Sequence, residues 1–269
     1  PEAAQAILET AREEELSQPD GPEVLGEAAL RVGAPELALR FLRGSMVSPS
    51  TERIRAAAEL DLDPRNSNAI ETLERLAAGQ GPEAEHAAGF RLMACLPPCL
   101  AEWHEPSADL LVGTDHEGLI RKIRVLSTVP RDPDEAKRLA MDLPAEPWAA
   151  EVRVRVALAI QDEEMMAVSA NEFLAFAPDQ SGRVLASEAL LRCGEVQSAR
   201  IHTAQVANSI HCPPKVRSDA FDLLLRALAK LDDWGTALGT WEAWRDLSIG
   251  QRDFDGRISA WQVRVYHHN

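Results

Sequence analysis

The sequence contains few aromatic residues, few cysteines and no long apolar run, and each shortage excludes a class of protein. Aromatic residues make up 5% of the chain, with a single tyrosine. Alternation of β-branched residues is scarce, whereas alanine and leucine, which form helices most readily, are abundant. Four cysteines in 269 residues are too few for a disulfide-held scaffold. No run of eighteen apolar residues occurs, so we expect no membrane insertion and an all-α, soluble protein.

Positive charge is also in short supply. The chain has 28 basic residues against 43 acidic ones, which gives a net charge of −15, and only 4 of the basic residues are lysines. Nucleic-acid binding needs a basic footprint, so the composition excludes nucleic acid as a partner. A basic peptide or protein is the electrostatically natural partner, although solubility alone explains an acidic surface equally well. The sparse cysteines favour a reducing compartment, and we expect a cytoplasmic location; an upstream targeting segment stays open because the chain begins at Pro1.

Motifs for catalysis and cofactor binding are absent from the sequence. It has no P-loop, no dinucleotide-binding glycine fingerprint, no nucleophile elbow and no zinc-protease motif. The acidic run at 162–164 stands where a helix should begin, and negative charge there complements the helix dipole. We therefore expect no enzyme activity and no cofactor.

Cys95, Cys99 and His104 form the one candidate metal site. A C-x3-C pair lies within the usual spacing of zinc ligands, but a structural zinc site needs a fourth ligand, and none is close in the sequence. The alternative is that both cysteines are small buried residues at a helix end. We expect no metal here.

The segment from 215 to 244 reads as two antiparallel helices. Phe221, Leu224 and Leu228 lie on one helical stripe, and after a break Ala237 and Trp241 continue a second one. In this order of large and small residues the segment resembles a tetratricopeptide repeat. It departs from that family at Leu225, where a small residue is usual, and at Trp244, where alanine is usual.

Other segments fit the same pattern at a similar spacing. The small residues expected at the helix crossings are Ala167, Ala199 and Ala237, at intervals of 32 and 38 residues, which bracket the roughly 34 of this family. Further matches are Leu25, Gly26, Ala38, Leu42, Ile70, Leu73, Ala77, Val154, Leu158, Ser187 and Leu190. HEAT-like or merely repeat-like hairpins are the nearest alternatives.

The resemblance implies a solenoid of helical hairpins wound as a right-handed superhelix. Three prolines make the stretch 97–114 irregular. We therefore divide the chain into hairpins at 1–97, a connection at 98–114 and hairpins at 115–269, with one continuous solenoid over 1–269 as the alternative.

In this family the first helix of each pair lines the ligand groove, which predicts the binding surface. The implied function is a non-enzymatic scaffold or adaptor for another protein or peptide, basic and with apolar anchors. The alternative is a regulatory or substrate-recruiting segment of a larger enzyme. Trp244 either caps the stack against Ile258 and Trp261 or is an exposed anchor. The expected partner-binding residues are Glu188, Asp222, Arg226 and Trp244. The first three belong to the expected groove positions, and the other groove positions are Val152, Val156, Ala159, Val184, Leu191 and Ala229.

Overall fold

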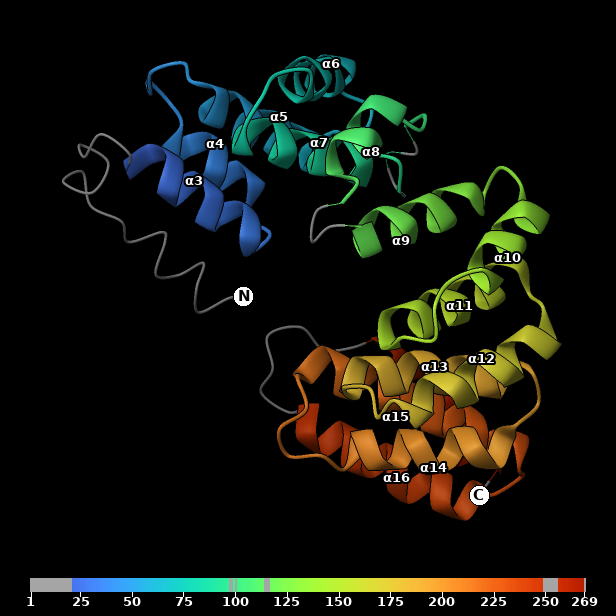
Figure 1. Cartoon of the computed structure of the whole chain (residues 1–269). Coiled ribbons are helices and arrows are strands. Elements are labelled where there is room, and N and C mark those ends of the chain that lie inside the picture. The colour runs from blue at the N-terminus through green and yellow to red at the C-terminus, as the bar shows by residue number, and fades with distance from the viewer. Residues whose placement is uncertain (1–20, 97–98, 100, 114–116, 249–255, 269) are drawn as a thin grey trace. The chain divides into compact units, whose positions relative to one another are not determined.

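The chain is all-helical wherever its structure is described. The computed structural model describes residues 21–96, 99, 101–113, 117–248 and 256–268, which contain 15 helices and no strand (Figure 1). The helices are α3 (Gly21–Arg31), α4 (Pro35–Phe41), α5 (Pro49–Leu62), α6 (Ser67–Ala77), α7 (Pro82–Met93), α8 (Glu105–Leu111), α9 (Glu117–Thr128), α10 (Pro133–Met141), α11 (Pro147–Ile160), α12 (Glu163–Ala175), α13 (Gln180–Arg192), α14 (Val196–Ala207), α15 (Pro214–Lys230), α16 (Trp234–Ser248) and α17 (Gly256–His268). The all-α prediction is confirmed. Within these ranges no helix is both long and apolar enough to cross a membrane.

Local sequence sets where the helices begin. Proline occupies the first turn of several of them, where its fixed φ suits the helix and its missing N–H costs nothing. Ser48 and Thr51 form a capping box at the start of α5. Asp162 caps α12 by accepting a hydrogen bond from the Met165 N–H at 2.9 Å. The acidic run at 162–164 therefore begins a helix, as the sequence predicts.

One turn geometry recurs at four helix–helix connections. In each, a residue with positive φ ends the first helix, and the next N–H returns to a carbonyl five residues earlier, as in a Schellman motif. The positive-φ residues are Gly33 (73°), Gln161 (59°), Gly194 (92°) and Asp232 (57°), and the returning bonds are Ala34 to Ala29 (2.9 Å), Asp162 to Ala157 (3.1 Å), Glu195 to Leu190 (2.8 Å) and Asp233 to Leu228 (3.0 Å). The sequence closes four hairpins, α3–α4, α11–α12, α13–α14 and α15–α16, in the same way.

Backbone contacts divide the chain into two compact units, 1–127 and 128–269. In the first, helices α3 to α8 each pack against the next, and α3, α5 and α7 also contact one another in turn. Leu42 and Ile54 lie in one apolar cluster of this unit, and Leu73, Leu92 and Ile123 lie in another. The division into 1–97, 98–114 and 115–269 stays a prediction.

The second unit repeats the same packing. Each of α10 to α17 packs on the next, and α11 contacts α13, which contacts α15 (Figure 1). The odd-numbered helices α11, α13 and α15 thus form a row. The predicted stripe residues Phe221, Leu224, Leu228, Ala237 and Trp241 are all buried in a cluster with Trp261 and Val265.

Candidate functional site

An acidic residue stands four positions before an arginine on each helix of this row. The pairs are Glu151–Arg155 on α11 (2.8 Å), Glu188–Arg192 on α13 (2.7 Å) and Asp222–Arg226 on α15 (3.3 Å). A spacing of four puts both members of a pair on the same helix face. The pairs on α13 and α15 lie on one face of the second unit, because Arg226 also reaches Glu188.

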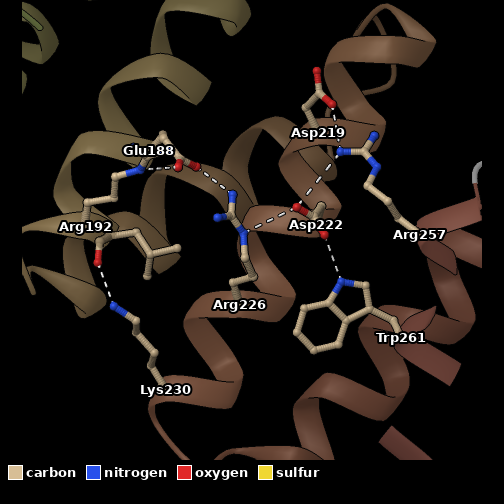
Figure 2. Close-up of polar contacts among 9 residues, drawn as sticks. Glu188, Arg192, Asp219, Asp222, Arg226, Lys230, Arg257 and Trp261 are labelled. Carbon is tan, nitrogen blue, oxygen red and sulfur yellow. Dashed lines mark hydrogen bonds and ion pairs between the residues drawn. The ribbon is translucent and has the colours of Figure 1, made fainter. Parts of the chain in front are cut away.

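Arginines also join α15 to α13 and to α17, as Figure 2 shows. Arg226 reaches back to Glu188 on α13 at 2.6 Å. Arg257 on α17 lies 3.0 Å from Asp219 and 3.9 Å from Asp222, both on α15. We call the six residues Glu188, Arg192, Asp219, Asp222, Arg226 and Arg257 the arginine ladder.

Two further bonds fix the ladder to the fold. The Trp261 Nε1–H donates to Asp222 at 2.8 Å, which ties α17 to α15. Lys230 Nζ donates to the Leu191 carbonyl oxygen at 3.0 Å and so satisfies a carbonyl in the last turn of α13. The first unit has a related link, because buried Arg53 on α5 pairs with Glu27 on α3 at 2.9 Å and with Glu83 on α7 at 2.8 Å.

Two carboxylates of the ladder are less exposed than its arginines. The side chains of Glu188 and Asp222 are 18% and 17% exposed, whereas those of Arg192, Arg226, Arg257 and Asp219 are 51%, 40%, 41% and 39% exposed. Burial raises the pKa of Glu188, but hydrogen bonds from Arg192 and Arg226 outweigh it and hold the pKa below its usual value. Glu188 and Asp222 thus lie beneath the arginines that bind them.

The structure brings three of the four predicted partner-binding residues together. Glu188, Asp222 and Arg226 belong to one network. Trp244 does not reach it: its ring is 2% exposed, and its Nε1–H donates to Ser218 Oγ at 3.2 Å. Its ring stacks on that of Phe221, with centroids 6.0 Å apart, in the cluster that holds Ile258 and Trp261. Of the two roles considered for Trp244, its position matches the one within the core.

Of the three groove positions expected on α11, Ala159 is exposed, but Val152 and Val156 are not. Val152 and Val156 are fully buried, and Glu151 and Arg155 face outward in their place. The acidic-x3-Arg spacing at Glu151 and Arg155 indicates the exposed face of α11, although the same spacing also occurs outside the row, at 36, 71 and 117. Hydropathy alone missed it, and also missed Arg192 and Arg257.

The three candidate metal ligands make other contacts. Cys95 is buried, and its thiol donates to the Glu102 carbonyl oxygen at 3.3 Å. His104 Nδ1 lies 2.7 Å from Ser107 Oγ. Burial, and then the charge of Asp61, raise the pKa of Cys99, which disfavours its thiolate. In the part of the chain that the structure describes, no three His, Cys, Asp or Glu side chains are grouped to hold a metal ion.

Comparison with known proteins identified no relative of this chain. No protein-family model, no curated protein and no solved structure matches the chain.

Proposed function

We propose that the chain is a non-enzymatic scaffold or adaptor, a tetratricopeptide-like solenoid that binds a segment of another protein. Support for the repeat arrangement comes from the turn shared by four hairpins and from the row of odd-numbered helices. A row of equivalent helices offers a long surface on which successive helices can contact one extended ligand.

The arginine ladder is the observation that carries this proposal. Arg192 engages Glu188 through Nε alone and is half exposed, so its other donors face outward. Guanidinium groups bind carboxylates in a planar, bidentate way, and they also accept main-chain carbonyls as partners. A partner segment that fits the arginine ladder therefore carries hydrogen-bond acceptors, either carboxylates or main-chain carbonyl oxygens. This differs from the basic segment expected from net charge, because Glu188 and Asp222 lie beneath the arginines.

The test is differential capture of partners from cells that express the protein. The bait variant Arg155→Ala/Arg192→Ala removes two exposed guanidinium groups but leaves the links of Arg226 and Arg257 between helices intact. The matched control is Arg121→Ala on α9, an equally exposed arginine in the same kind of pair with Glu117. We expect the double variant, and not the control, to lose specific partners in quantitative mass spectrometry. Equal recovery with all three baits would contradict the proposal.

A further inference from the structure

A second surface of the same unit is a groove between α10 and α12. Its volume is about 470 Å³, and the segment after α10 closes one side. Its apolar lining comes from Met141, Leu143, Met165 and Val168. Met141 and Val168 are 58% and 63% exposed, so apolar surface stands open at the mouth of the groove. Methionine adapts its shape to different apolar ligands.

The floor of the groove is a buried arginine with its donors already engaged. Arg153 binds Glu172 in a bidentate way, at 3.1 Å through Nε and 2.7 Å through Nη2. Its remaining hydrogen bonds go to the carbonyl oxygens of Ala140 (3.5 Å), Leu143 (3.2 Å) and Pro144 (3.3 Å). The guanidinium therefore holds α10, α11 and α12 together and does not serve as an anion site.

The rim of the groove is left with negative charge. Its lysine, Lys137, is paired with Asp162, and Arg153 is paired with Glu172. Glu164 lines the groove and is exposed, and no cation among the described residues lies within ion-pair distance of it. The hydrogen bond that Lys137 donates to Asp162, and the charges of Asp162 and Glu164, raise the pKa of Lys137, as expected in a negative field.

We propose that this groove binds an amphipathic segment of a partner protein, whose apolar side chains enter between Met141 and Val168 while a lysine or arginine pairs with Glu164. The shape follows the helix-in-groove mode of recognition, in which apolar side chains on one face of a helix enter a hydrophobic groove. The charge of the segment follows from the rim. The groove is separate from the arginine ladder and takes a ligand of opposite charge, so it goes beyond the function proposed above.

Two other possible ligands of the groove match the negative charge of its rim less well. Residues 1–20 of this chain carry six carboxylates and one arginine, so they would bring negative charge to Glu164. A second copy of the chain carries a net charge of −15 and would be repelled in the same way.

The experiment measures binding of three synthetic peptides to the full chain by fluorescence anisotropy. The first peptide has leucines on one helix face and lysines on the other; the second replaces its lysines by glutamates, and the third replaces its leucines by serines. We expect the first to bind and the other two to bind at least roughly tenfold more weakly. No binding of the first peptide, or equal binding of the second, would overturn the proposal.

Variants of the chain place the peptide in the groove. Glu164→Lys and Val168→Asp should each weaken the first peptide by roughly tenfold, whereas the controls should change its affinity by less than about twofold. The controls are Glu242→Lys on α16 and Ile201→Asp on α14, both exposed residues outside the groove. All four change exposed side chains, and circular dichroism checks that each is folded. Equal losses in variants and controls would place the peptide elsewhere and refute the site.

The same variants also test whether the groove binds a second copy of the chain or a small apolar molecule instead. If sedimentation shows a dimer that Val168→Asp dissociates, the groove belongs to a second copy and the proposal is wrong. It is equally wrong if a small apolar dye binds in a Val168-dependent way and no peptide does. Arg155→Ala/Arg192→Ala should leave peptide binding unchanged, so failure here and failure of the ladder proposal are separate results.

Discussion

Arg226 on α15 joins two carboxylates from different helices: its Nη2 atom lies 2.6 Å from Glu188 on α13, and its Nε atom lies 3.3 Å from Asp222 on its own helix. The first contact spans 38 positions of sequence. A side chain that is 40% exposed contributes little through any one such pair, because water and salt screen it. Its importance lies in fixing the register between two helices of the row.

The stability contributed by Glu188 should depend on pH. Its pKa is lowered in the folded chain from the usual 4.5, because two arginines outweigh the effect of burial. A lowered folded pKa means that the contribution is present above about pH 4.5 and is lost as the pH falls through the folded value. Urea unfolding of the wild type and Glu188→Gln should therefore differ more at neutral pH than in acid. A difference that stays constant with pH would contradict this.

Truncation should destabilise the fold at Arg153 but not at Arg155. Arg153→Ala leaves Glu172 and the carbonyls at the end of α10 without their donor, so we expect a loss of about 2–4 kcal/mol. Arg155 is 49% exposed and pairs only within its helix, so Arg155→Ala should change stability by no more than about 0.5 kcal/mol. Denaturant unfolding followed by circular dichroism measures both. Similar losses in the two variants would refute the structural role of Arg153.

At the recurring turns, the backbone conformation should determine how a substitution changes stability. Gly194→Ala places a Cβ in open space but at φ +92°, so we expect a loss of about 1 kcal/mol from strain alone. Gln161 holds the equivalent position with φ 59°, and Gln161→Gly should gain up to about 1 kcal/mol. As a control, Gly239→Ala inside α16 meets no neighbour and should gain about 0.5–1 kcal/mol. The three thermal midpoints should shift in these directions; a stabilising Gly194→Ala would disprove the argument.

The tryptophans of α16 should differ in their contribution to stability. Trp241 is 2% exposed, and its Nε1–H donates to the Ile258 carbonyl oxygen at 2.8 Å, so Trp241→Ala should cost about 3–5 kcal/mol. Trp234 is half-buried and packs at the edge of the cluster, against His268. Trp234→Ala should cost about 1–2 kcal/mol. Guanidinium unfolding followed by circular dichroism gives the order; an equal cost would show that Trp234 is a core residue.

Hydrophobic periodicity was sufficient to predict the all-helical class and the buried stripe of α15. Phe221, Leu224 and Leu228 are buried because a stripe of large apolar side chains on a helix has no other favourable place. Periodicity did not identify the exposed face of α11, since this helix is buried nearly all round and its apolar residues do not mark one side. There only the charged pair Glu151–Arg155 carries the information.

The groove could not be predicted from the sequence. Its lining comes from two helices and the segment between α10 and α11, and its floor depends on which carbonyls at the end of α10 are left unpaired. Hydropathy does not distinguish Arg153, which is buried, from Arg155, which is not. That difference arises only when the neighbouring helices are packed.

Because Arg153 ties the end of α10 to Glu172 on α12, the two walls of the groove are held at a fixed separation before any ligand arrives. A segment that enters would lose its own conformational freedom but would not have to order the protein. Most of the entropic cost of association would then fall on the partner. A partner segment already helical in its free state should therefore bind more tightly than one of the same sequence that is disordered.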